Sequence, residues 1–480
     1  MSKKFEPLRV CQPCQRFLRF FGRVGIVFIL TIGVLLLPTP EGLTLEGHRA
    51  VAATVFTGAL LALQPVSLPI AGLLVPVILI SFELADSTLA FEPFSRPVIF
   101  LVLGSLFLAE AMRKHGLTRR LALLTVVASK GNISKLLFGI MGIAALFSMW
   151  VENTAIAAVL IPVALTISRE IHDVEKAREL LSLLVLGIAY SASLGGMVTI
   201  MGSASNAVTS GFLATLHAWS FVDWMRFGLP VFLLLFPVTW WIVQRLVPVS
   251  IKQLDIESAS QELNKKELRS PFEREIIITM AVTILLWIMG SVLEGILILP
   301  STLLSPAVIA VVTVAYLSMR GVINWEDVKG ISWGFLFIIG AGLSLGEALS
   351  RTGATDWFAN LIGPIITQPP MLVSLLFLIL LSALLTNVIN NATVAVVFVP
   401  MLINIAQSSS VFNPLQLVLP VAFATTFGYS LPSASGRMAL ISTLGIIDRK
   451  EMIRSGLVLT VLSSIILAVF FYGLLLLNWI

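Results

Sequence analysis

Residues 136–167 have the sequence LLFGIMGIAALFSMWVENTAIAAVLIPVALTI, in which two apolar stretches are separated by the polar residues Glu152, Asn153 and Thr154. A helix needs about 20 apolar residues to cross a bilayer. Each stretch here is too short to do so comfortably. Two such helices can enter the membrane and return on the same side, with the polar residues at the tip. The segment therefore predicts a re-entrant hairpin in a helical membrane protein.

The composition of the whole chain agrees with this prediction. The protein has 480 residues, of which 57% are hydrophobic and 12% are charged, whereas soluble proteins have about 25% charged residues. Residues 180–222 and 357–436 contain no Asp, Glu, Lys or Arg at all. The net charge of +5 does not indicate nucleic-acid binding, because Lys and Arg gather in short loops, as the positive-inside rule predicts.

The apolar segments predict an all-α polytopic membrane protein with about 11 transmembrane segments. We expect two inverted repeats, each with a re-entrant hairpin and a broken helix, and no soluble domain. The predicted parts are a cytoplasmic tail 1–23, a first span and first repeat 24–248 (hairpin 134–168, broken helix 180–218), a cytoplasmic linker 249–275, and a second repeat 276–480 (hairpin 370–408, broken helix 415–448).

Lys and Arg in the loops predict the orientation of the chain in the membrane. The basic segments should be cytoplasmic, and the loops without Lys or Arg should face outward. The N-terminus is then cytoplasmic, and we expect the protein in the cell (inner) membrane. The segments predicted to be cytoplasmic are the N-terminal tail, 113–120, 169–178, 252–275, Arg320 and 449–454; those predicted to face outward are 206–222, 294–302 and 409–414.

An internal repeat relates the two halves, with an offset of 237 or 238 residues up to the hairpins and of 230 at the breaks that follow them. By the charge rule, the matching spans run in opposite directions, and inverted repeats with broken helices are typical of secondary transporters. Small residues also mediate ordinary helix packing, but packing alone does not explain two polar breaks in register. The matching segments are 106–116 with 343–353, 152–154 with 390–392, and 202–206 with 432–436.

The tip of a re-entrant hairpin has chemical consequences. Its backbone N–H and C=O groups cannot face lipid, so they face water, protein or a ligand. Helix N-termini attract anions, while helix C-termini and unwound carbonyl groups suit a cation. Paired tips therefore predict cation-coupled transport of an anion.

Residues 148–155, with Pro162 eight residues beyond Thr154, resemble the Ser-Asn-Thr hairpin of the divalent anion:sodium symporter (DASS, INDY-type) family of the ion transporter superfamily. Residues 195–206 resemble the unwound Gly-Thr-Pro-Pro-Asn loop of that family. The resemblance implies a homodimer, a mobile transport domain, and Na⁺-driven uptake of dicarboxylates or sulfate. It places Na⁺ at Ser148, Asn153 and Gly202 in the first half, and at Thr386, Asn391 and Ala434 in the second half.

The substrate-facing positions depart from the family pattern. Glu152 and Asn390 stand where the family has Ser, and Ala392 stands where it has Thr. Arg437 stands where the second loop would carry Pro. The predicted substrate-binding residues are Glu152, Asn153, Thr154, Ser203, Asn390, Asn391, Thr393, Ser435 and Arg437.

Glu152 and Arg437 are the two charges placed deepest in membrane segments, where ionisable residues are functional by default. Glu152 could pair with Arg437, carry a proton, or select a substrate less anionic than a dicarboxylate. Alternatively, Glu152 faces a cytoplasmic water pocket and Arg437 extends to the membrane interface. Arg437 could also hold a carboxylate or oxyanion through two parallel hydrogen bonds.

These observations predict a secondary active transporter for a small anion, a dicarboxylate, sulfate or a similar oxyanion, coupled to Na⁺ and working by alternating access. The alternative is a proton-coupled anion exchanger or a cation/proton antiporter of the same architecture. We expect no enzymatic activity, because metalloprotease, nucleophile-elbow and phosphate-loop motifs are absent from the sequence. We expect no cofactor beyond Na⁺ and no partners beyond the small anion, the bilayer and a second copy of the chain.

Overall fold

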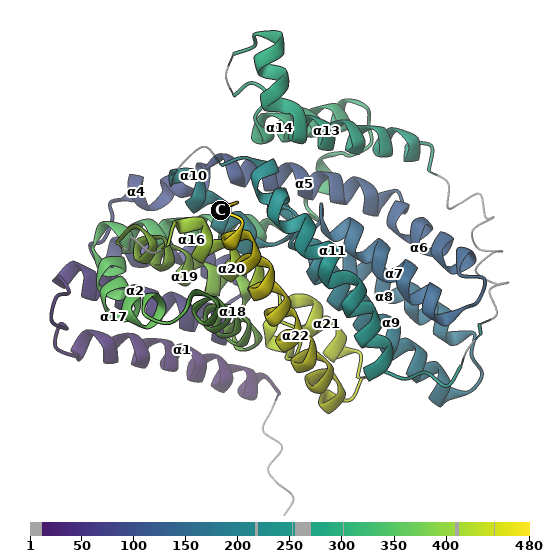
Figure 1. Ribbon diagram of the computed structural model, residues 1–480, viewed down its shortest axis with the longest axis horizontal. Coiled ribbons are helices and arrows are strands. Elements are labelled where there is room, and N and C mark those ends of the chain that lie inside the picture. Colours follow the sequence, from purple (N-terminus) through teal and green to yellow (C-terminus); the bar gives the residue numbers. More distant parts are fainter. Residues whose placement is uncertain are drawn as a thin grey trace, which may run out of the picture.

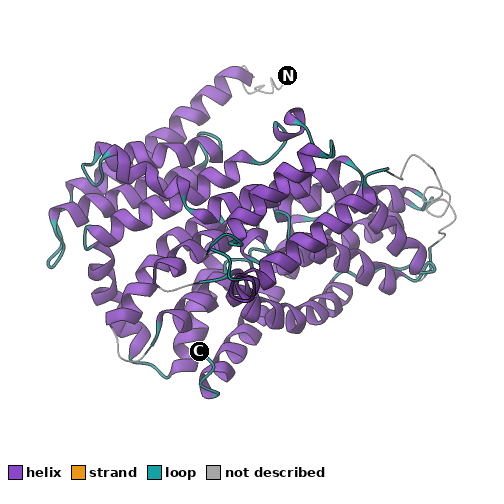
Figure 2. Cartoon of the chain, turned by 90° about the horizontal axis from the view of Figure 1, so that it is seen from above, coloured by secondary structure: helices purple, strands orange, loops and turns teal. Residues whose placement is uncertain are grey.

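The computed structural model describes residues 12–216, 219–251, 253–254, 270–300, 302–408, 412–445 and 447–480, with side chains from residue 21 onward. Over these ranges the chain is helical, and its β structure is limited to one isolated bridge between Asn132 and Gln253 (Figure 2). The predicted all-helical fold class is confirmed. Residues 1–11 of the predicted tail, and 252 and 255–269 of the predicted linker, lie outside the described residues.

The first half begins with helices that lead up to a hairpin and a helix with a break. The hairpin is α7 and α8, and the broken helix consists of α9, η2 and α10. The elements are α1 (Gln12–Leu36), α2 (Leu45–Leu63), α3 (Leu68–Ser81), α4 (Ser87–Phe91), η1 (Glu92–Ser95), α5 (Pro97–Lys114), α6 (Leu117–Ala128), α7 (Ile133–Ser148), α8 (Asn153–Arg169), α9 (Val174–Gly196), η2 (Ile200–Gly202), α10 (Ala204–Leu216) and α11 (Phe221–Leu246).

The second half has the same order of elements. Its hairpin is α18 and α19, and its broken helix consists of α20, η4 and α21. The elements are α13 (Glu273–Leu297), α14 (Pro306–Met319), α15 (Trp325–Val328), α16 (Trp333–Arg351), α17 (Ala354–Thr367), α18 (Met371–Val388), α19 (Asn391–Ser408), α20 (Pro414–Ala424), η4 (Pro432–Ala434), α21 (Gly436–Thr443) and α22 (Arg449–Leu476).

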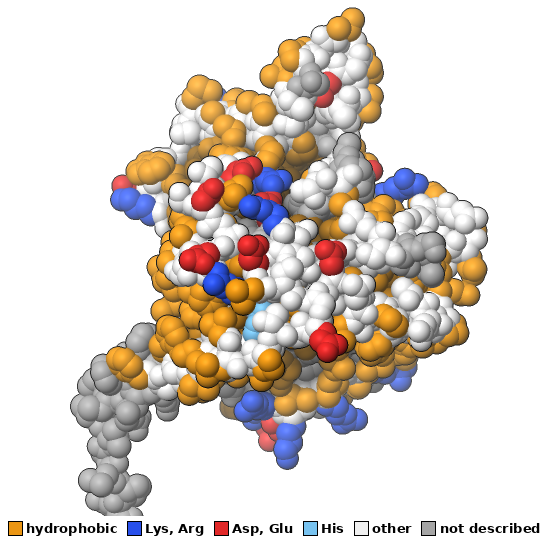
Figure 3. Space-filling view, turned by 90° about the vertical axis from the view of Figure 1, so that its left-hand side faces the viewer, with side chains coloured by type: hydrophobic (Ala, Val, Ile, Leu, Met, Phe, Trp, Pro, Cys, Tyr) orange, Lys and Arg blue, Asp and Glu red, His pale blue; other side chains and the backbone are white. Residues whose placement is uncertain are grey.

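Several helices are long and apolar enough to cross a bilayer. In the described part of the chain there are seven, or eight if α4–η1 and α5, bent by 44°, form one span. Six shorter apolar helices, including α7 and α8, have 10–17 residues. Hydrophobic side chains cover broad areas of the surface, and charges gather in small groups (Figure 3). A polytopic membrane protein is confirmed, whereas the predicted number of about 11 segments stays a prediction, since helix length alone does not decide it.

Equivalent helices of the two halves make equivalent contacts across the molecule. Helix α3 packs on α16 and α5 packs on α14, although α3 corresponds to α14 in the repeat and α5 to α16. Likewise α10 packs on α19, and α21 packs on α8. Each hairpin therefore contacts the broken helix of the other half as well as its own. Helices α18, α20, α21 and α22 lie in the middle of the molecule, while α13 and α14 lie along one edge (Figure 1).

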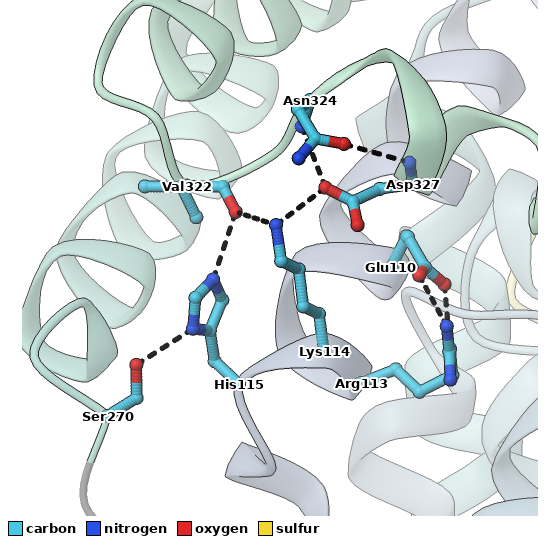
Figure 4. A network of polar contacts seen from close by, with 8 residues as sticks. All are labelled: Glu110, Arg113, Lys114, His115, Ser270, Val322, Asn324 and Asp327. Carbon is cyan, nitrogen blue, oxygen red and sulfur yellow. Dashed lines mark hydrogen bonds and ion pairs between the residues drawn. The ribbon is translucent and has the colours of Figure 1, made fainter.

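A polar network joins three segments that the sequence predicts to be cytoplasmic (Figure 4). At the end of α5, Lys114 pairs with Asp327 at 2.6 Å. His115 bonds through its two ring nitrogens to Ser270 and to the carbonyl oxygen of Val322, at 2.8 and 2.9 Å. Burial is the largest single influence on Asp327 and raises its pKa, but the hydrogen bonds from Lys114 and the Asn324 N–H, together with the nearby charges of Lys114 and His115, lower the net pKa. The three segments thus share one side of the molecule.

Candidate functional site

The first hairpin tip connects α7 to α8 through residues 149–152. Glu152 is the N-cap of α8, and its Oε2 accepts a hydrogen bond from the Ala155 N–H at 3.1 Å. Its Oε1 accepts a hydrogen bond from the Thr154 hydroxyl at 2.7 Å. A negative charge at this place is stabilised by the positive end of the helix dipole. The next residue, Asn153, is buried and only 3% exposed.

The break between α9 and α10 lies against the first tip. Gly196 permits this approach, because a Cβ atom there would lie 2.1 Å from Oδ1 of Asn153. The Thr199 hydroxyl donates a hydrogen bond to the carbonyl oxygen of Met149 in the tip. Asn206 donates to the carbonyl oxygens of Gly196 and Thr199, both at 2.8 Å. The side chain of Asn206 therefore holds two carbonyl groups that the break leaves without helical partners.

The second hairpin tip connects α18 to α19 through Ile389 and Asn390. Asn390 caps the backbone of the following helix, since its Oδ1 accepts a hydrogen bond from the Ala392 N–H at 2.9 Å. The Thr386 hydroxyl lies 2.7 Å from Oδ1 of Asn391 and 2.9 Å from the carbonyl oxygen of Thr425. Glu152 and Asn390 align in the repeat. Each thus accepts a hydrogen bond from the N-terminus of the helix that follows its own tip, α8 for Glu152 and α19 for Asn390.

Arg437 lies at the break between α20 and α21 and is only 1% exposed. Its Nη2 donates to Ser193 Oγ at 2.7 Å, and to the carbonyl oxygens of Thr426 and Gly428, both at 3.3 Å. Its buried Nε has no hydrogen-bond partner among the described residues. One side of the guanidinium therefore holds unwound carbonyl groups, much as Asn206 does in the first half, and the other donors are left for further contacts.

The two halves meet at the tips. Gly436, the first residue of α21, lies so close to Thr154 that a Cβ atom there would be 2.7 Å from its hydroxyl oxygen. The Thr425 hydroxyl lies 2.9 Å from the hydroxyl of Ser205 in α10. The first tip, the second break and both broken helices are therefore parts of one packed unit.

A cavity of about 340 Å³ opens between the two tips. The structure brings most of the residues predicted for the substrate to its walls. Those that line it are Glu152, Asn153, Thr154, Ser203, Asn390, Asn391, Ser435 and Arg437, together with Gly202, Ala204, Ala392 and Gly436.

Other predicted residues lie behind the cavity walls. Thr393 is buried in α19 and does not line the cavity, and its hydroxyl has no partner among the described residues. The cation candidates Ser148, Thr386 and Ala434 are also buried and outside the lining. Candidate cation ligands thus extend from the cavity wall, at Asn153, Gly202 and Asn391, into the protein behind it.

The predicted pairing of Glu152 with Arg437 is not formed in the structure. None of the ion pairs among the described residues joins these two side chains. Both nevertheless line the same cavity.

One wall of the cavity was not predicted from the sequence. It is formed by the first turns of α3 and α16, which pack on each other. Gly334 makes this contact possible, because a Cβ atom there would lie 2.3 Å from Cγ of Pro69. Apolar helix starts of this kind carry no signal that separates them from other membrane helices. The residues of this wall are Leu68, Pro69, Ser332, Gly334, Phe335 and Ile338.

The oxygens behind the first tip suit a small hard cation. Ser148 Oγ is buried and has no hydrogen-bond partner among the described residues. One end of the Asn153 amide faces the carbonyl oxygens of Gly202 and Ala192; turned by 180°, its nitrogen donates to them at 3.0 and 3.1 Å. In the other orientation the amide oxygen converges with the two carbonyl oxygens, and a cation would complete this arrangement. The donor set fits Na⁺.

The equivalent oxygens behind the second tip are engaged with one another. The Thr386 hydroxyl has both Oδ1 of Asn391 and the Thr425 carbonyl oxygen within hydrogen-bond distance, and its single proton is shared between these two acceptors. Gly428 brings Asn391 and Ala434 close together, because a Cβ atom there would lie 3.5 Å from Oδ1 of Asn391 and 3.0 Å from Cβ of Ala434. A cation at this tip would have to replace the bond between Thr386 and Asn391.

A profile of the citrate transporter family matches residues 59–428, more than half of the chain. The chain belongs to the citrate transporter family. The match begins in α2 and extends through both hairpins into the second break, and of the cavity-lining residues only Ser435, Gly436 and Arg437 lie beyond it. Membership of this family indicates a transporter rather than an enzyme, and it confirms the family resemblance seen at the tips.

Curated relatives in this family agree with the assignment. A transporter of Haemophilus influenzae is 28% identical over 456 residues, covering 93% of this chain and 96% of the relative. The sodium-dependent dicarboxylate transporter SdcS of Staphylococcus aureus is 28% identical over 497 residues, covering 95% and 94%.

Two solved structures have a similar fold. The YdaH transporter of Alcanivorax borkumensis has a TM-score of 0.53 at 12% identity and covers 97% of this chain and 98% of its own. MtrF of Neisseria gonorrhoeae has a TM-score of 0.53 at 14% identity and covers 94% of each chain. At these identities the likeness concerns the fold, which this citrate transporter family member shares over its whole length.

Proposed function

We propose that the protein is a secondary active transporter that couples the movement of a small carboxylate or similar oxyanion to Na⁺ by alternating access. The observation that carries this proposal is the meeting of both hairpin tips and both broken helices around one cavity, with a cation-type oxygen cluster behind the first tip. The relative named as a sodium-dependent dicarboxylate transporter supports both the anion and the ion.

The substrate anion and Na⁺ bind at different positions, the anion in the cavity and Na⁺ at the first tip, partly behind the cavity wall. The substrate anion is held by Asn153, Asn391, Ser203 and Ser435 and by the available donors of Arg437. Sodium is held by Ser148, Asn153 and the Gly202 carbonyl. Because Asn153 lines the cavity and also faces the cation cluster, binding of either partner organises the same residue, and this makes the two binding events cooperative.

The second predicted cation set, Thr386, Asn391 and Ala434, stays a prediction. We assign the coupling ion to the first tip because the buried Ser148 hydroxyl has no hydrogen-bond partner among the described residues. The protein is further proposed to work as a homodimer in the cell membrane with a cytoplasmic N-terminus. Helix α13, with 28% of its apolar segment buried, offers a large surface to lipid or to a second subunit.

The proposal is tested by uptake into proteoliposomes. Radiolabelled succinate, citrate and sulfate are each offered with an inward Na⁺ gradient, with an equal K⁺ gradient, and with a proton gradient. Accumulation that requires Na⁺ supports the proposal. Accumulation that follows the proton gradient and ignores Na⁺ would contradict it and favour the proton-coupled alternative, which the carboxylate of Glu152 in the cavity makes a definite second candidate.

A further inference from the structure

The cavity is lined by one carboxylate, Glu152, which forms no ion pair among the described residues, although the guanidinium of Arg437 lies near enough to attract it electrostatically. Glu152 lines the cavity, and both of its carboxylate oxygens act as acceptors, one from Thr154 and one from the Ala155 N–H. A carboxylate has room for about four hydrogen bonds. Capacity therefore remains on Glu152 for donors from the cavity.

Arg437 does not supply this missing partner. Its Nη2 is engaged with Ser193 and with the carbonyl oxygens of Thr426 and Gly428, on the side of the second break. It forms no ion pair with Glu152. The negative charge at the first tip and the positive charge at the second break are thus presented separately to whatever binds between them.

Several polar groups near the second tip can donate hydrogen bonds into the cavity. Ser435 has a buried hydroxyl without a partner among the described residues, and Asn390 and Asn391 offer side-chain amides at the start of α19. Arg437 adds a positive charge on the same side. A carboxylate group of a bound substrate therefore finds hydrogen-bond donors at the second tip. Near Glu152, by contrast, the cavity attracts a donor or a cation and repels an anion.

We infer that the substrate is a small carboxylate that also carries an ammonium group, with the carboxylate at the second tip near Arg437 and the ammonium at Glu152. This inference rests on the proposed function and narrows its substrate class. An aminodicarboxylate, with a net charge of −1, meets both ends of the cavity. A plain dicarboxylate of the same length brings a second negative charge toward Glu152 and binds less tightly.

The test compares ligands that differ in a single group. Purified full-length protein in Na⁺ is titrated with succinate and L-aspartate, and with glutarate and L-glutamate, and ligand-induced thermal stabilisation gives the affinities. We expect the amino-substituted member to bind about tenfold more tightly, or more, because a hydrogen bond between charged groups in a partly buried site has that value.

A variant with Asn in place of Glu152 provides the decisive comparison. Asn is the residue that caps the second hairpin helix at the matching position, so Glu152→Asn retains a cap while removing the charge. We expect the preference for the amino compound to disappear, through weaker aspartate binding and unchanged or tighter succinate binding. Glu152→Gln serves as a second variant if the first unfolds. As a matched control, Asn390→Asp should weaken both ligands to a similar extent.

Each outcome separates the inference from the proposed function. Wild-type protein that binds succinate as tightly as aspartate overturns the inference and leaves a small-carboxylate transporter in place. So does a Glu152→Asn variant that keeps the wild-type ratio. Loss of Na⁺ dependence in that variant without a change of ratio would make Glu152 a cation ligand and also overturn the inference. If none of the four compounds stabilises the wild-type protein, the inference is overturned, and Na⁺-driven uptake of citrate and sulfate then decides the proposed function separately.

Discussion

The two hairpin tips have the same construction but differ in the hydrogen bonding of their matched hydroxyl groups, Ser148 and Thr386. At the second tip, the hydroxyl of Thr386 donates to Asn391 and to a backbone carbonyl, and Arg437 donates to the carbonyl groups of the break. At the first tip, the hydroxyl of Ser148 is buried without a described partner. Of these two matched hydroxyls, the one at the second tip is thus engaged by the protein itself, and the one at the first tip is available to an added cation.

The two halves thus have a similar backbone arrangement, but their matched hydroxyl groups differ in hydrogen bonding. A buried hydroxyl without a partner costs free energy, so its retention at Ser148 is explained if a ligand completes it. The second break carries its own positive charge at Arg437 and has less need of a bound ion. We therefore expect the Na⁺ response to come from the first tip and the anchoring of the anion to come from the second.

Alanine at one glycine in each break tests this division with the largest expected effect. In Gly196→Ala, the added Cβ would lie 2.1 Å from Oδ1 of Asn153 and displace that side chain, whereas in Gly428→Ala the nearest atom is Cβ of Ala434 at 3.0 Å. We expect Gly196→Ala to reduce Na⁺-driven uptake to background and Gly428→Ala to keep most of it. The opposite order in proteoliposome uptake would contradict the comparison.

Arg437→Lys tests the second tip. Lysine retains the charge but lacks the planar arrangement of donors that bonds both carbonyl groups and an anion. We expect the affinity for the transported anion to fall by about a hundredfold, as measured by thermal shift titration. Arg245→Lys is the matched control, since that guanidinium lies over Trp241 at the end of α11. Wild-type affinity in Arg437→Lys would exclude the anchoring role.

Removal of one hydroxyl from each tip gives a smaller and more specific effect. Thr386→Ala leaves two buried acceptors without their donor, so we expect it to lower the free energy of unfolding by about 1–3 kcal/mol, with or without Na⁺. Ser148→Ala removes a hydroxyl without a described partner, so stability in K⁺ should stay near wild type while the thermal stabilisation by Na⁺ disappears. Equal behaviour of the two variants in a thermal melt would remove the distinction between the tips.

The smallest effect concerns the helix caps, where the tips should agree. Glu152→Ala and Asn390→Ala each remove an N-terminal hydrogen-bond acceptor, so we expect each to lose about 1 kcal/mol of stability in the absence of substrate. Glu152→Asn, which retains a cap, should lose little. A much larger loss for Glu152→Ala than for Asn390→Ala would show that the carboxylate has a further structural partner.

The sequence singled out most of the polar side chains that line the cavity, because polar residues inside long apolar segments are conspicuous. Eight of the residues predicted for the substrate line the cavity. Thr393 does not, because it lies two residues beyond the start of α19 and is buried behind the cavity wall. The packing of Arg437 against backbone carbonyl groups was also missed, since sequence shows a charge but not its direction.

The apolar half of the site and the number of spans were beyond sequence reasoning for a related reason. Pro69, Phe335 and Ile338 resemble the residues of every other membrane helix, so nothing distinguishes them until the fold places them at the cavity. Helices such as α3 and α14 have 14 residues each and are short for a bilayer. Whether they span it depends on their tilt and their neighbours rather than on composition.

The apolar wall formed by α3 and α16 has a mechanical consequence. Five of its six residues have no polar side-chain atom, whereas the hydrogen-bonding side chains gather on the hairpins and broken helices opposite. A substrate bound to the tips therefore forms few hydrogen bonds with side chains of that wall. If the tips move as a unit, they can therefore move along this wall while the hydrogen bonds between the substrate and the tips stay intact.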